Sequence, residues 1–149
     1  MTAPADPAGP PRSSAIATWL ALVGGGLGLH RFYLHGSRDV WAWLHPWPTL
    51  VGAYGFWRMR EFGVYDARGS LLVPILGVML AATMLQAIVY GLASDERWAA
   101  RHGAASAAVQ RGWLTYVGVV VALAVGASVA VATIAFTAQR YFESRVGIS

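Results

Sequence analysis

The chain reads AIATWLALVGGGLGLHRFYL over residues 15–34, where an uncharged apolar stretch runs directly into a short aromatic and cationic hinge. No charged side chain occurs between Ala15 and Leu29, and the hinge begins with His30 and Arg31. A second apolar stretch, rich in tryptophan, follows over residues 40–57. Two apolar stretches joined by a short polar hinge predict a helical hairpin in a membrane.

Two longer uncharged stretches follow, over residues 71–92 and 113–137. At about 1.5 Å per residue, each is long enough to cross a ~30 Å hydrocarbon core. We therefore predict an all-α integral membrane protein with four transmembrane helices, of which the second is kinked or broken at Pro46/Pro48 because proline cannot donate the helical hydrogen bond. Four spans would place both chain ends on one side of the membrane.

The predicted organisation divides the chain into six segments. They are a flexible tail (residues 1–14), a hairpin of the two-transmembrane type (15–63), a third span (70–92), an interfacial connector (94–112), a fourth span (113–137) and a second tail (138–149). The first tail is rich in proline and small residues and cannot bury enough surface to fold alone. In the connector, Ser94 followed by Asp95 and Glu96 predicts a capped helix start, and Gly103 predicts its end.

The charge pattern also indicates a membrane protein. All eleven positively charged side chains are arginine, and the formal net charge is +4. They lie in the connecting segments, where they would contact lipid headgroups. No connector is large enough to fold into a nucleic-acid reading module, so we predict no nucleic-acid partner. Cysteine is absent, which excludes disulfides, thiolate chemistry and cysteine-ligated zinc.

Residues 13–63 resemble the two-transmembrane-domain family, often called TM two. The matching features are the glycine-rich GGGLG (residues 24–28), the hinge HRFYL (residues 30–34), Gly36, Pro48, Thr49, Gly52, Gly55 and Trp57. In animal members of the family the hinge reads Asp-Arg-Phe. Here His30 replaces the Asp, which looks like the usual bacterial version. Because the family has no settled biochemical activity, the resemblance implies a membrane hairpin without implying a reaction.

The candidate functional residues are those of the hinge, His30, Arg31, Phe32 and Tyr33. The planar guanidinium of Arg31 can hold a lipid phosphate or a partner carboxylate, with the two aromatic rings anchoring at the membrane interface. The alternative is that Arg31 only ends a helix and fixes topology.

Three histidines at positions 30, 35 and 45 invite a metal site, but their spacing does not place two imidazoles on one helix face. We therefore predict hydrogen-bonding histidines at the interface, with no metal and no cofactor.

Small residues predict where helices pack closely. In the last span they recur every four residues, a seam that lets another helix backbone approach. The glycine run of the hairpin ends an apolar helix and does not open one after a strand, so it predicts packing and no dinucleotide loop. The predicted packing positions are Gly24, Gly28, Gly118, Ala122, Gly126 and Ala130.

No catalytic constellation is visible in the sequence, and the predicted spans lack the central ionisable residues that mark transport pathways. We expect a small non-enzymatic, multi-pass protein of the cell membrane, in particular the bacterial inner membrane. It would act as an interaction or accessory component of a membrane complex. Its expected partners are membrane lipids and either other membrane subunits or further copies of itself. The alternative is a channel or carrier formed by oligomers. A membrane-embedded enzyme would need a polar cluster that only the folded arrangement could assemble.

Overall fold

The computed structural model describes residues 11–103, 106 and 112–147. Every element in this part of the chain is helical. The elements are α1 (Ser14–Gly24), the 3-10 turn η1 (Gly25–Leu27), α2 (Leu29–His35), α3 (Val40–Leu44), α4 (Pro46–Phe62), α5 (Ala67–Leu92), α6 (Asp95–His102) and α8 (Trp113–Val146). Most of the predicted first tail lies outside the described residues, as do residues 104–105 and 107–111 of the connector and 148–149 of the second tail.

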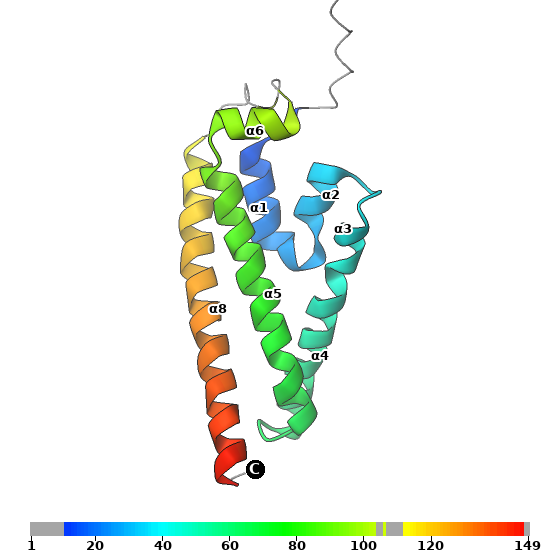
Figure 1. Cartoon of the computed structure of the whole chain (residues 1–149), viewed down its shortest axis with the longest axis vertical. Helices are drawn as coiled ribbons and strands as arrows, with labels where there is room; N and C mark the ends of the chain where they lie inside the picture. The colour runs from blue at the N-terminus through cyan, green and yellow to red at the C-terminus, as the bar shows by residue number, and fades with distance from the viewer. Residues whose placement is uncertain (1–10, 104–105, 107–111, 148–149) are drawn as a thin grey trace, which may run out of the picture.

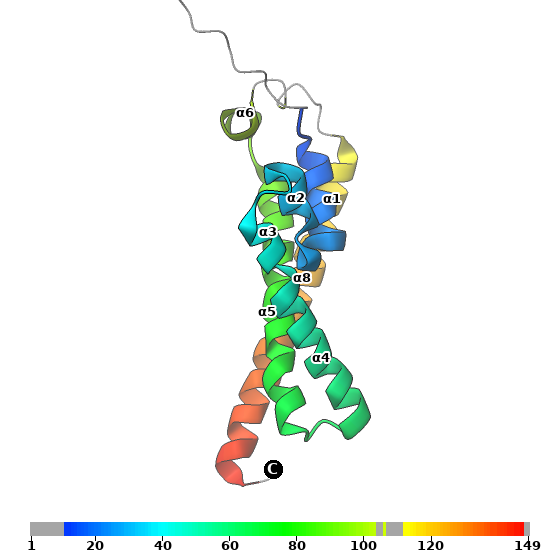
Figure 2. The same ribbon diagram turned by 90° about the vertical axis from the view of Figure 1, so that its right-hand side faces the viewer.

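The helices form an elongated bundle built on α5 and α8, which pack against each other in opposite directions (Figure 1). α6 lies across one end of this pair, and Figure 2 shows it end-on. α1 packs on both α5 and α8 in the half of the bundle nearer α6, whereas α4 packs on α5 in the other half.

The prediction of four transmembrane helices is wrong. Among the described residues, two helices are long and apolar enough to cross a membrane, Ala67–Leu92 and Trp113–Val146. The second of these continues past Thr137, so the predicted tail over residues 138–149 is helical as far as Val146. The other two apolar stretches form shorter pieces, for reasons that are local to each stretch.

The first stretch is interrupted by its own glycines. α1 ends at Gly24, η1 follows, and Gly28 adopts the left-handed conformation with φ 76°. The chain reverses there, and α2 runs back toward the end of the bundle where α1 began (Figure 1). The expected hairpin between two membrane-crossing helices is therefore a shorter hairpin between α1 and α2.

The second stretch is divided between α3 and α4, with the break at His45 and Pro46 as the first residue of α4. α4 has 17 residues, about 26 Å of helix, and its last turns carry Arg58, Arg60 and Glu61. This is shorter than a ~30 Å hydrocarbon core. Because α3 and α4 lead the chain from the half of the bundle nearer α6 to the other end before α5 starts, the described chain begins near α6 and ends at the opposite end of the bundle (Figure 1). This overturns the expectation, drawn from four spans, that both chain ends lie on one side.

α4 and α5 approach each other closely because α4 carries glycine at the contact. Gly52 and Gly55 are both buried. A Cβ atom built on Gly52 would lie 2.6 Å from Cβ and 2.7 Å from Cα of Leu76, and one on Gly55 would lie 2.5 Å from Cβ of Leu72. Any side chain at either position would therefore collide with the backbone region of α5.

The turn between α4 and α5 is fastened by an arginine and an aspartate eight residues apart. Arg58 donates from Nε to Oδ2 and from Nη2 to Oδ1 of Asp66, both at 2.8 Å. Asp66 is also the N-cap of α5, where Oδ2 accepts from the backbone N–H of Gly69 at 2.7 Å. The hydrogen bonds from Arg58 lower the pKa of Asp66 to about 2.

Candidate functional site

The reversal at Gly28 directs His30, the first residue of the predicted site, toward the interior of the bundle. His30 is 0% exposed and Leu34, one turn later, is 1% exposed, whereas Arg31, Phe32 and Tyr33 are partly exposed. α2 thus presents one face to the bundle and the rest of the hinge to its rim. The sequence predicts all four residues at the membrane interface, whereas His30 is buried in the bundle.

His30 lies in a small polar cluster, which we call the histidine cluster and define as His30, His45, Gln86 and Tyr90. The ring centroid of His30 is 5.5 Å from that of His45 and 5.9 Å from that of Tyr90. Gln86 of α5 also interacts with the His30 ring. Within the described residues, the two ring nitrogens of His30 and the Oε1 atom of Gln86 are buried and have no hydrogen-bond partner of good geometry.

Burial of polar atoms without partners costs about 1–3 kcal/mol per group, so such an arrangement needs an explanation. A neutral imidazole can accept a hydrogen bond on one nitrogen, donate one from the other, or take up a proton. A metal site has less support, because within residues 11–103, 106 and 112–147 no three metal-ligating side chains come together. The chemistry that fits the histidine cluster is hydrogen bonding by a neutral imidazole, because burial, and after it the nearby His45, lower the pKa of His30 to about 4.

The contact between His30 and His45 could not be found from their spacing, because it joins α2 to the junction of α3 and α4. It depends on Gly28, where a Cβ atom would lie 2.8 Å from the carbonyl oxygen of Ala42 and 3.0 Å from Cβ of His45. The missing side chain therefore lets this junction close over the start of α2.

Arg31, the predicted phosphate or carboxylate ligand, is paired within its own chain. Its Nε and Nη2 atoms lie 3.0 and 2.9 Å from Oδ2 of Asp39, the N-cap of α3. Nδ1 of His35 lies 3.8 Å from the same oxygen. Burial raises the pKa of Asp39, but the hydrogen bonds from Arg31 and from the N–H of Trp41 outweigh it and hold that pKa below its usual value. The guanidinium group of Arg31 thus stabilises the turn between α2 and α3.

Phe32 and Tyr33 also hold the hairpin. The ring of Phe32 packs edge-on against Trp43, with centroids 5.2 Å apart. The hydroxyl oxygen of Tyr33 accepts a hydrogen bond from the backbone N–H of Ser13 at 2.8 Å. Because Ser13 is the N-cap of α1, this bond joins the beginning of α1 to α2.

The predicted packing positions fall on several contacts. A Cβ atom on Gly118 would lie 3.1 Å from Thr18 of α1, and one on Gly126 would lie 2.7 Å from Cβ of Met84 in α5. Ala122, between them, is 0% exposed. Gly24 lies against Leu29 within the hairpin, and Ala130 lines a groove between α5 and α8.

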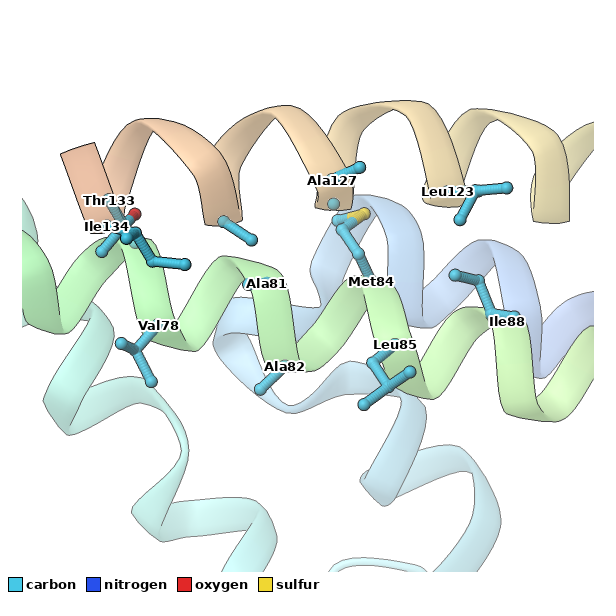
Figure 3. Close-up of a pocket in the computed structure, with 13 residues that line it drawn as sticks. Val78, Ala81, Ala82, Met84, Leu85, Ile88, Leu123, Ala127, Thr133 and Ile134 are labelled. Atoms are coloured by element: carbon cyan, nitrogen blue, oxygen red, sulfur yellow. The ribbon is translucent and has the colours of Figure 1, made fainter.

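That groove has a volume of about 520 Å³. Figure 3 shows side chains of α5, such as Met84 and Ile88, and of α8, such as Leu123 and Ile134, around it. Its lining is almost wholly apolar, and small residues on both helices make it hollow.

No family model matches the chain, and neither a curated protein nor a solved structure matches it. The resemblance of residues 13–63 to the two-transmembrane-domain family therefore stays a prediction.

Proposed function

We propose that the protein is an integral membrane protein anchored by α5 and α8. The supporting observation is that both helices are largely exposed. In the most apolar 18-residue stretch of each helix, only 17% of α5 and 11% of α8 is buried within the fold. An apolar helix in the core of a water-soluble protein would be mostly buried, and soluble monomers rarely expose large contiguous apolar patches. A signal sequence would lie near the N-terminus, whereas these helices begin at Ala67 and Trp113.

The ends of the helices suit membrane interfaces. α6 lies across one end with Asp95 and Glu96 in its first turn and Arg101 and His102 in its last. Short charged helices that lie across the ends of spans are typical of the headgroup region. The His30 form of the hinge motif favours a bacterial protein, which leads us to propose the bacterial inner membrane as its location.

Within the membrane the protein acts through contacts and not through catalysis, as an interaction or accessory component of a larger complex. The side chains best suited to contact a protein partner are the exposed large aromatic residues of α3 and α4. They are Trp41, Trp43, Trp47, Tyr54, Phe56 and Trp57. Tryptophan and tyrosine dominate the energetics of protein interfaces because they bury much area at low entropic cost.

Purification in a mild detergent, with a photo-crosslinking amino acid in place of Trp47, tests this role. Trp47 is 67% exposed, and the matched control carries the same crosslinker at Leu71, which is 75% exposed at the start of α5. A larger membrane subunit crosslinked from position 47 and not from position 71 supports the accessory role. Crosslinking only between copies of the chain contradicts it.

One observation favours the second candidate, a channel or carrier formed by oligomers. His30 is an ionisable side chain buried against α5, and buried ionisable groups mark ion pathways in membrane proteins. This candidate requires a closed homo-oligomer that conducts protons in liposomes and loses that flux in His30→Leu. A monomer without flux removes it.

A further inference from the structure

A cleft of about 280 Å³ opens where α6 crosses the end of α5. Ile88, Val89 and Leu92 of α5 form its apolar floor, while Arg97 and Arg101 of α6 stand at its rim. The two arginines are four residues apart and both exposed, so they project from one side of α6. Positive charge thus stands above apolar surface at the end of a proposed membrane span.

The position of α6 over this cleft is fixed by Trp98, which is 3% exposed. Its Nε1 atom donates a hydrogen bond to the carbonyl oxygen of Arg12 at 2.6 Å, and its ring packs on His102 at 4.4 Å between centroids. Burial, and after it the positive charge of Arg12, lowers the pKa of His102 below its usual value. This shift favours the neutral form of His102, and the arginines supply the positive charge of the rim.

The floor of the cleft continues into the groove between α5 and α8, since Ile88 lines both. Val78, Leu85 and Leu92 recur every seven residues along this face of α5 and are 61%, 61% and 60% exposed. From Ile88 to Gly77 the groove follows about 17 Å of helix. That length is close to one leaflet, which is half of a ~30 Å hydrocarbon core.

We propose that the cleft and the groove together bind one anionic phospholipid, with its phosphate between Arg97 and Arg101 and an acyl chain along the groove beside Ile88. This inference rests on the proposed function, because it requires α5 and α8 to lie in a membrane. Arginine forms short, strong charge-assisted hydrogen bonds with phosphate. The small residues of the groove, such as Ala81 and Ala127, leave the width that an acyl chain fills.

The headgroup contact is tested with the delipidated full chain in detergent, by native mass spectrometry during titration with phosphatidylglycerol or phosphatidylcholine. We expect phosphatidylglycerol to bind at least tenfold more tightly, and Arg97→Gln with Arg101→Gln to remove that preference. The matched control is Arg60→Gln with Arg68→Gln, which removes the same charge from exposed positions at the other end of α5 and should retain it. Equal binding of both lipids, or an unchanged preference in the Arg97/Arg101 variant, overturns the proposal.

Two further experiments identify the ligand. Inorganic phosphate should not compete with phosphatidylglycerol at millimolar concentration; full competition would show a free-anion site and overturn the lipid assignment. Ala127→Phe, at an exposed position, should fill the groove and weaken phosphatidylglycerol binding at least fivefold. If this variant instead changes the oligomeric mass and leaves lipid affinity unchanged, the groove is an interface between copies and the proposal fails.

Alkaline extraction of membranes tests the membrane assignment separately from the lipid site. A chain released into the soluble fraction contradicts the membrane assignment itself. A chain that stays in the membrane but shows no effect of Arg97 and Arg101 on lipid preference contradicts only the lipid site.

Discussion

Adding one methyl group at the crossing of α4 and α5 should destabilise the protein measurably. In Gly52→Ala the new Cβ would lie 2.6 Å from Cβ and 2.7 Å from Cα of Leu76, and a main-chain atom cannot rotate away. Overpacking of this kind costs about 1–3 kcal/mol, and the immovable neighbour favours the upper half of that range. Alanine is about 1 kcal/mol better than glycine inside a helix. We therefore expect a net loss of about 1–2 kcal/mol.

The free energy of unfolding can be measured by titrating sodium dodecyl sulfate into mixed micelles and following helicity by circular dichroism. Ala53→Leu is the matched control, because it enlarges the next residue on the exposed side of α4 and should change stability by less than about 0.5 kcal/mol. A Gly52→Ala protein as stable as the wild type, or more stable, would show that α4 and α5 do not cross at this position.

Three further predictions concern the turns and the topology. The pKa of Asp66 is lowered from 3.8 to about 2, so its pairing with Arg58 stabilises the fold above about pH 4 and is lost as the pH falls through about 2. The melting temperature of the wild type should therefore fall more steeply between about pH 4 and about pH 2 than that of Asp66→Asn. Parallel curves for the two proteins would contradict the pairing. Arg31→Lys should lower the melting temperature, because an ammonium cannot reproduce the two guanidinium donors that contact Asp39. Arg38→Lys is the control and should leave the melting temperature unchanged. Equal melting temperatures for the two variants would refute a stabilising role for the Arg31–Asp39 pair. Ser94 is the N-cap of α6 and Ser144 lies near the end of α8, and these two helix ends lie at opposite ends of the bundle (Figure 1). Single cysteines at the two positions should therefore react with an impermeant maleimide from opposite sides of the membrane, and labelling from the same side would exclude the topology.

Much of the helical architecture could be predicted because its signals are local. The positions of α5 and α8 follow from their uncharged length, and the limits of α6 follow from Ser94, whose hydroxyl accepts from a backbone N–H, and from Gly103, which has φ 90°. The fate of the first apolar stretch could not be predicted in the same way. The glycines of residues 24–28 are compatible both with close packing of a full span and with a reversal. Only the left-handed conformation of Gly28 decides between them.

The candidate site shows the same division. Arg31 could be chosen from the sequence, because a guanidinium at the end of an apolar stretch needs an anion. Its partner Asp39 lies eight residues away across a turn, outside the three- and four-residue spacings that place side chains together on a helix. The burial of His30 against His45 and Gln86 depends on three separate elements, and no local pattern predicts it.

The reversal at Gly28 also matters for how the chain would enter a membrane during synthesis. Because α2 returns toward the end of the bundle where α1 starts, the turn between α2 and α3 lies nearer that end (Figure 1). Arg38 and Asp39 belong to this turn, and Arg31 pairs with Asp39, so the three charged residues stay together on that side. A hairpin of two full spans would have had to carry all three through the centre of the hydrocarbon core, where insertion scales give a charged side chain an unfavourable free energy of about 2.5–3.5 kcal/mol. Insertion of α1 and α2 therefore requires no translocation of charge, and the first charges to cross are those at the end of α4.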